Sequence, residues 1–163
     1  MADNAANTNV KDSTSNGNNG TDSVNTCTRT TAGQIDGALL FQNSSSNWVS
    51  LGNSASLHVS STFTFEAWVN LASTPTGAYG LLTCANTIGY NYAFLINNGR
   101  SVQYRENNST SGAGNNIGGA VPLNTWAFVT ATFDGTNIRF YQNGALSTTA
   151  ASTLGQWWRC LAG

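Results

Sequence analysis

The stretch that decides the fold runs from residue 121 to 144 and reads Val-Pro-Leu-Asn-Thr-Trp-Ala-Phe-Val-Thr-Ala-Thr-Phe-Asp-Gly-Thr-Asn-Ile-Arg-Phe-Tyr-Gln-Asn-Gly. Apolar residues fill every second position of 127–133, so one side of an extended strand there would be apolar. Asp134-Gly135 and Asn143-Gly144 are hairpin signals, because glycine adopts positive φ at low steric cost. The stretch predicts an antiparallel meander whose apolar face is covered by a second layer.

Working outward, short runs rich in β-branched and aromatic residues recur at hairpin spacing. We expect further strands at 37–41, 48–51, 63–69, 79–84, 90–96 and 100–105. Asn98-Gly99 is another hairpin signal, and no helix of ordinary length is visible. The fold class predicted is all-β, a two-sheet antiparallel sandwich.

The composition excludes several classes of function. Only 8% of the 163 residues are charged, against a usual value of about 25%, and the net charge is −1. Such a chain has no basic field to attract nucleic acid, so no nucleic-acid partner is expected. It has no run of about 20 apolar residues for membrane insertion, and its N-terminus shows no signal peptide.

The three cysteines, Cys27, Cys84 and Cys160, lack metal-type spacing. One disulfide with one free thiol and three buried thiols are both open, because an unpaired cysteine is often a core residue. The polar segment 1–34 contains a dense cluster of turn formers at 11–21. It is either a disordered leader or an ordered loop laid over a sheet.

Four stretches in order resemble the laminin G-like, concanavalin A-like jelly-roll domains of extracellular proteins. They are 12–21, 33–41 with 48–52, 63–69, and 122–144. The resemblance implies a concanavalin A-like jelly roll, an extracellular or cell-surface location within a longer protein, and three parts: a leader loop at 1–34, a sandwich core at 35–155 and an atypical tail at 156–163.

Both ends of the chain depart from the family pattern. Met1-Ala2 stands in place of an opening strand, and 154–163 does not resemble the usual closing strand. We therefore expect a domain truncated at both ends, with self-association through exposed sheet edges. Trp157 and Trp158 would be exposed by the truncation.

No enzyme activity is expected. Related glucanases pair two carboxylates closely on one strand, whereas Glu66 and Glu106 lie far apart here and no Ser/Asp arrangement needs His58. Glu66 is better interpreted as a strand residue paired with a neighbour. A glycoside hydrolase fragment is therefore the least favoured of the functions considered.

Some laminin G-like domains hold calcium through loop carboxylates and carbonyls. Gln42-Asn43 stand where members often carry Asp-Gly, which removes one candidate ligand. Calcium is left open as a cofactor, with Asp36 and Asp134 as candidate ligands, although the Asp-Gly turn already explains Asp134.

The leading function predicted is glycan recognition, since aromatic faces and planar amides bind sugars. The candidate site combines Tyr90, Asn91, Tyr92, Tyr104 and Asn107 with the Asn-rich loop 107–119. Any single tyrosine can also be an ordinary strand residue, and Trp48, Trp68 and Trp126 are expected in the core. The alternative function is a structural or adhesion spacer that binds an extracellular protein.

Overall fold

The computed structural model describes residues 8–42, 47–59, 62–86, 89–106 and 116–151. The chain divides into two compact units, residues 1–57 and 58–163. Each unit is described by itself below, unit 2 first.

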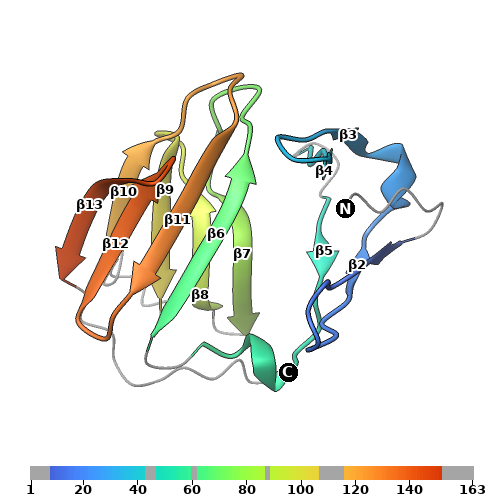
Figure 1. The fold of residues 1–163 in the computed structure, drawn as a ribbon, viewed down its shortest axis with the longest axis horizontal. Helices are drawn as coiled ribbons and strands as arrows, with labels where there is room; N and C mark the ends of the chain where they lie inside the picture. The colour runs from blue at the N-terminus through green and yellow to red at the C-terminus, as the bar shows by residue number, and fades with distance from the viewer. Residues whose placement is uncertain (1–7, 43–46, 60–61, 87–88, 107–115, 152–163) are drawn as a thin grey trace. The chain divides into compact units, whose positions relative to one another are not determined.

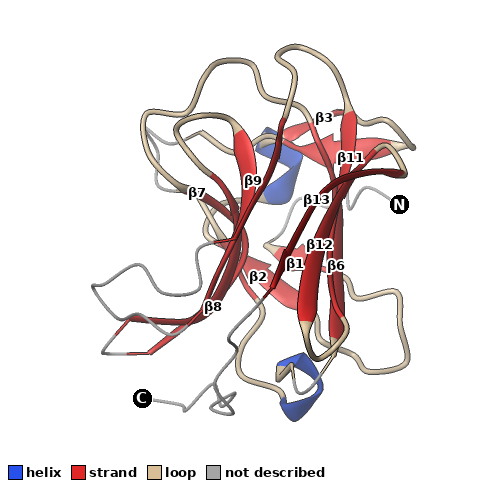
Figure 2. Cartoon of the chain, turned by 90° about the vertical axis from the view of Figure 1, so that its left-hand side faces the viewer, coloured by secondary structure: helices blue, strands red, loops and turns tan. Residues whose placement is uncertain are grey.

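Unit 2 is built from two four-stranded antiparallel sheets (Figures 1 and 2). One sheet has the order β13-β12-β11-β6 and the other the order β10-β9-β8-β7. The strands are β6 (Phe63–Val69), β7 (Tyr79–Asn86), β8 (Gly89–Ile96), β9 (Ser101–Glu106), β10 (Asn116–Ala120), β11 (Ala127–Phe133), β12 (Asn137–Gln142) and β13 (Ala145–Ala151). This arrangement confirms the predicted all-β sandwich, and the meander is formed by β11, β12 and β13.

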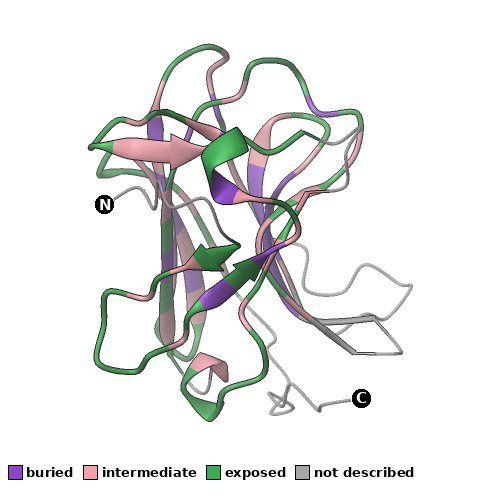
Figure 3. Cartoon of the chain, turned by 90° about the vertical axis from the view of Figure 1, so that its right-hand side faces the viewer, coloured by how far each residue is buried: buried purple, intermediate pink, exposed green. Residues whose placement is uncertain are grey.

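The strand β11 lies at the centre of its sheet and pairs with β6 along its whole length. Val129 lies opposite Ala67, and Phe133 opposite Phe63. Ala127, Val129, Ala131 and Phe133 are all buried, as the alternation of the sequence predicts. The other sheet contributes the facing half of the core, including Phe94, Ile96, Val102 and Tyr104. The buried segments lie along the strands of both layers (Figure 3).

Two of the three predicted hairpin turns form as expected. Gly135 has φ 96°, and Asn143 and Gly144 have φ 52° and 80°. In the third turn, the residue with positive φ is Arg100, at 64°, rather than Gly99. The Asn97 side chain holds this turn because its oxygen accepts the amides of Gly99 and Ser101 at 2.8 and 3.0 Å.

Glycines let the two sheets approach each other at the β10 edge. A Cβ added at Gly118 would lie 2.6 Å from the Cβ of Phe140 on β12, and one at Gly119 would lie 2.6 Å from the Oγ of Ser147 on β13. Residues 116–120 form this strand although the sequence predicts a loop over 107–119. Residues 107–115 lie outside the described part of the chain.

Unit 1 is ordered around short strands and 3₁₀ turns: β1 (Asn9–Val10), β2 (Gly20–Asp22), η1 (Thr26–Thr28), β3 (Thr30–Ala32), β4 (Gly37–Leu39), β5 (Val49–Ser50) and η3 (Ala55–Leu57). β2 pairs with both β1 and β5, and β3 pairs with β4. Residues on both sides of the expected boundary at 34/35 pair with each other, and the two compact units divide after Leu57.

The turn-rich segment of unit 1 is an ordered loop. The Asp12 carboxylate accepts the amides of Thr14 and Asn18, each at 2.8 Å, and the Thr14 hydroxyl at 2.8 Å. The interpretation of residues 11–21 as part of a disordered leader is therefore wrong. Among the described residues, no helix has the length and apolar character that crossing a membrane requires.

Three aromatic side chains do not lie where the sequence suggests. Trp48 and Trp68 are 59% and 40% exposed, and Trp126 is half-buried, so the expectation of three core tryptophans is wrong. Phe41 is also exposed, together with Leu40, because the strand expected at 37–41 ends at Leu39.

Candidate functional site

The tyrosines predicted to stack on sugars lie inside the sandwich. Tyr92 and Tyr104 are 4% and 0% exposed. Tyr92 lies on the same side of β8 as Phe94, and Phe94 pairs with Tyr104 across the strands, so all three face the core. Tyr92 stacks on Phe65 at 5.4 Å between ring centroids, and Tyr104 lies 5.0 Å from Phe63. As sugar platforms these two residues are wrong predictions.

The rest of that predicted site is outside what the structure describes. Tyr90 pairs with Ala85 through the backbone, but the side chains of Tyr90 and Asn91, and the whole of Asn107, lie outside the described part. Their predicted role stays a prediction.

The two aspartates predicted as calcium ligands lie in separate units. Asp36, in unit 1, is exposed at a turn with φ 62°. Asp134, in unit 2, uses its carboxylate within its own turn, where it accepts the amides of Thr136 and Asn137 at 2.9 and 2.7 Å. Within the described ranges, no group of three or more His, Cys, Asp or Glu residues is placed to hold a metal ion.

A different surface of unit 2 collects exposed aromatic and polar side chains. Because core positions alternate with outward ones along β6, β11 and β12, the intervening residues share the outer side of their sheet. The three strands lie side by side in Figure 1. We call this surface the aromatic face and define it by six residues: Glu66, Trp68, Phe128, Thr130, Arg139 and Tyr141.

Trp68 and Phe128 form the aromatic centre of the face. They lie directly opposite each other on β6 and β11. Their ring centroids are 5.2 Å apart and the ring planes are tilted by 40°. Trp68 is 40% exposed, so a large part of its ring is open to a ligand. Such a pair contributes both apolar contact area and a π-face to which the C–H groups of a sugar can pack.

Polar groups surround this pair at sheet spacing. Glu66 lies two residues before Trp68 and opposite Thr130, and Thr130 lies opposite Tyr141 on the next strand. Neighbouring strands are about 4.8 Å apart, so the row Glu66–Thr130–Tyr141 spans about 10 Å. A row of that length matches one or two sugar rings and offers a carboxylate and hydroxyl groups for hydrogen bonding.

One ion pair lies at the end of the face. The guanidinium of Arg139 donates to the Asp134 carboxylate at 2.5 Å between Nη1 and Oδ2. Hydrogen bonds from the Asn137 amide, from Arg139 and from the Thr136 amide lower the pKa of Asp134 to about 2. The carboxylate in turn raises the pKa of Arg139. The pair therefore stays ionised, and its two charges cancel.

The sequence carried a signal for this face. Thr64, Glu66 and Trp68 share one side of the strand 63–69, opposite its phenylalanines. That alternation places Trp68 away from the core. Trp68 was nevertheless expected in the core, because tryptophan side chains are usually buried.

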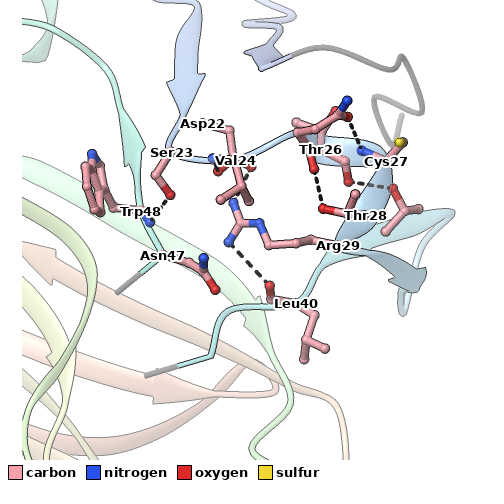
Figure 4. Close-up of polar contacts among 12 residues, drawn as sticks. Asp22, Ser23, Val24, Thr26, Cys27, Thr28, Arg29, Leu40, Asn47 and Trp48 are labelled. Carbon is pink, nitrogen blue, oxygen red and sulfur yellow. Dashed lines mark hydrogen bonds and ion pairs between the residues drawn. The ribbon is translucent and has the colours of Figure 1, made fainter. Parts of the chain in front are cut away.

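Unit 1 holds a second cluster, around a buried ion pair between Arg29 and Asp22. Burial raises the pKa of Asp22, but hydrogen bonds from Arg29 and the Val24 amide outweigh it and hold that pKa below its usual range. Arg29 also donates to the Leu40 carbonyl at 3.3 Å (Figure 4). Its guanidinium carbon lies 4.4 Å from the centroid of the Phe41 ring. Nearby, Ser23 accepts the Trp48 amide at 3.1 Å. The cluster holds the loops of unit 1 together.

Comparison with known proteins gave one family and one solved structure. Residues 43–160 match the laminin G member of the concanavalin A-like lectin/glucanases superfamily. The chain is also similar to the crystal structure of the alginate lyase from Corynebacterium sp., with 22% sequence identity and a TM-score of 0.31. That likeness covers 58% of this chain and 40% of the lyase chain. No match was found among curated proteins.

The family match spans most of the chain and includes both sheets of unit 2. It agrees with the antiparallel sandwich and with the order of the motifs in 48–69 and 122–144. On these grounds the chain belongs to the concanavalin A-like lectin/glucanases superfamily.

Proposed function

We propose that this chain is a non-catalytic glycan-binding module of an extracellular protein, and that it binds through the aromatic face of unit 2. The observation that carries the proposal is the Trp68–Phe128 pair, which is paired in register, partly exposed and flanked by Glu66, Thr130 and Tyr141. Aromatic rings with convergent polar groups are the usual composition of a sugar site. Membership of a lectin and glucanase superfamily supports the same class of ligand.

The spacing of carboxylates supports binding without hydrolysis. Glycosidases hold two carboxyl groups about 5–10 Å apart across the scissile bond. On the aromatic face and its adjoining turn, the described carboxylates are Glu66 and Asp134. Asp134 lies four residues beyond Thr130, the partner of Glu66, which corresponds to about 13 Å along the strand. We therefore expect no release of reducing ends from β-glucans. Turnover that Glu66→Gln abolishes would contradict this.

Affinity electrophoresis tests the binding proposal. The chain migrates through native gels that contain one soluble polysaccharide each, and retardation reports binding. Trp68→Ala should weaken binding about fivefold, as expected for the loss of about 1 kcal/mol of aromatic stacking. The matched control is Trp48→Ala, which removes an exposed tryptophan of unit 1. Equal retardation of the wild-type chain and Trp68→Ala would contradict the proposal.

A specific observation favours a second candidate, an adhesion role for unit 1. Four large apolar side chains of unit 1 are exposed, at Ile35, Leu40, Phe41 and Trp48, and exposed apolar side chains are the material of protein interfaces where they form a continuous patch. If this role is correct, Trp48→Ala and Leu40→Ser should weaken attachment of the chain to an extracellular-matrix surface, whereas Trp68→Ala should not. The reverse pattern would favour the glycan proposal alone.

A further inference from the structure

The charge of the aromatic face narrows the class of glycan that it can bind. Three charged side chains lie on the described part of this face and its adjoining turn: Glu66, Asp134 and Arg139. Arg139 and Asp134 neutralise each other, and Asp134 also accepts two backbone amides. Glu66, which is exposed, therefore leaves the face with a net charge of −1. The one cation present is already bound to a carboxylate.

The neighbours of Glu66 are aromatic and hydroxyl-bearing. Trp68 follows two residues later on the same side of β6, Phe128 is diagonal to it on β11, and Thr130 lies directly opposite. Tyr141 stands one strand further, beside Thr130. A carboxylate with π-faces around it attracts an ammonium group through both its charge and the ring quadrupoles. The same carboxylate repels a second carboxylate.

We propose that the aromatic face prefers glycans that carry free amino groups, such as hexosamine polymers, over neutral glycans, and that it rejects polyuronates. This inference rests on the proposed function, since it assigns the ligand class of the same surface. Trp68 and Phe128 would pack against the sugar ring, and Glu66 would accept a hydrogen bond from the amino group. Arg139 is already neutralised by Asp134, so it offers little net positive charge to a uronate.

The test compares three probes by isothermal titration calorimetry at neutral pH and low salt: glucosamine oligosaccharides, the same oligosaccharides fully N-acetylated, and oligouronates. The amino form should bind two- to fivefold more tightly than the acetylated form, roughly the strength of an exposed ion pair, and oligouronates should bind weakest. Glu66→Gln should bring the amino and acetylated forms to equal affinity, because it removes the charge that distinguishes the two probes.

The control is Asp36→Asn, which removes the same charge in unit 1 at a turn whose left-handed backbone asparagine tolerates. It should preserve the preference for amino sugars. Equal binding of amino and acetylated forms to the wild-type chain, or a preference that persists in Glu66→Gln, would overturn this inference and leave the proposed function standing. Tightest binding of oligouronates would likewise overturn it. Failure of all three probes to bind would overturn this inference, whereas the proposed function is decided separately by the affinity electrophoresis of Trp68→Ala.

Discussion

Arg29 shows how one side chain organises a unit with little apolar core. Its side chain is 7% exposed and that of Asp22 is fully buried, so neither charge has much contact with water. A buried charge is costly unless it is paired. Arg29 meets this requirement with Asp22, the Leu40 carbonyl and the Phe41 ring, and thereby joins segments that are distant in the sequence.

Replacing Arg29 should therefore unfold unit 1 more easily. Arg29→Ala leaves Asp22 buried without its cation, and we expect a loss of about 3 kcal/mol of unfolding free energy. Trp48 is the single tryptophan of residues 1–57, so its fluorescence in urea titrations of variants that lack the other tryptophans reports on this unit. Lys11→Ala, which removes an exposed cation, is the control and should change the midpoint little. Equal midpoints for the two variants would contradict this account of Arg29.

The lowered pKa values of Asp22 and Asp134 predict how stability depends on pH. Each carboxylate has a folded-state pKa below the ordinary value of 3.8, so its contribution is complete above that value and is lost as the pH falls through the folded-state pKa. For Asp134 this window extends from about 4 down to about 2. The melting temperature should be level near neutrality and fall in this acid range.

The variant Asp134→Asn distinguishes the pH-dependent stability contributed by Asp134 from that contributed by Asp22. It should melt below the wild-type chain at pH 7 and approach it near pH 2, because protonation removes the same charge from the wild-type carboxylate. Differential scanning calorimetry at several pH values measures this convergence. A constant difference between the two curves down to pH 2 would show that the ionised form of Asp134 does not stabilise the turn.

At the scale of the elements, alternation made β6 and β11 predictable to the residue. Their bounds, 63–69 and 127–133, match the sequence-based expectation because each strand has a consistently apolar side. Strand β10 was not predictable, because its Asn-Ile-Gly-Gly-Ala sequence has low β-propensity. Its glycines are instead required by the close approach to Phe140 and Ser147. That close approach depends on the packing of the two sheets, so the local sequence pattern of residues 116–120 does not reveal it.

The close approach of β10 to β12 predicts the effect of a single methyl group. In Gly118→Ala the new Cβ would lie 2.6 Å from the Cβ of Phe140, which is buried and cannot move aside. We expect a loss of about 1–3 kcal/mol of unfolding free energy, measured by chemical denaturation. Gly77→Ala is the matched control, because nothing lies within 4 Å of its added Cβ. A neutral Gly118→Ala variant would contradict the packing described for this edge.

At the scale of the whole molecule, the sequence predicted the fold better than the candidate site. The fold depends on many alternating positions, and an error at one of them changes little. The site depends on which side of a strand a few aromatic residues occupy. Tyr104 and Trp68 each follow the alternation of their own strand, yet residue-type preferences alone placed the first outside and the second inside. The pairing register of a strand determines which of its side chains face the core and which face outward.

The cysteines allow a prediction for the chain as a whole. Cys27 is exposed and free. The alternative in which all three cysteines are buried thiols is therefore wrong. Cys84 is half-buried against the core, and Cys160 lies outside the described residues. We predict one disulfide, between Cys84 and Cys160. Mass spectrometry after alkylation in denaturant should show one label without reductant and three with it. Three labels without reductant would contradict the disulfide.

The central claim is that glycans bind on the aromatic face of unit 2, and an NMR titration with neutral and amino oligosaccharides tests it most directly. The account predicts that the indole N–H signal of Trp68 and the amide signals of Glu66, Thr130 and Tyr141 shift together in a saturable manner. The signals of β8, β9 and unit 1 should stay in place. Shifts confined to β8, β9 or unit 1, or no shift at millimolar oligosaccharide, would contradict the claim.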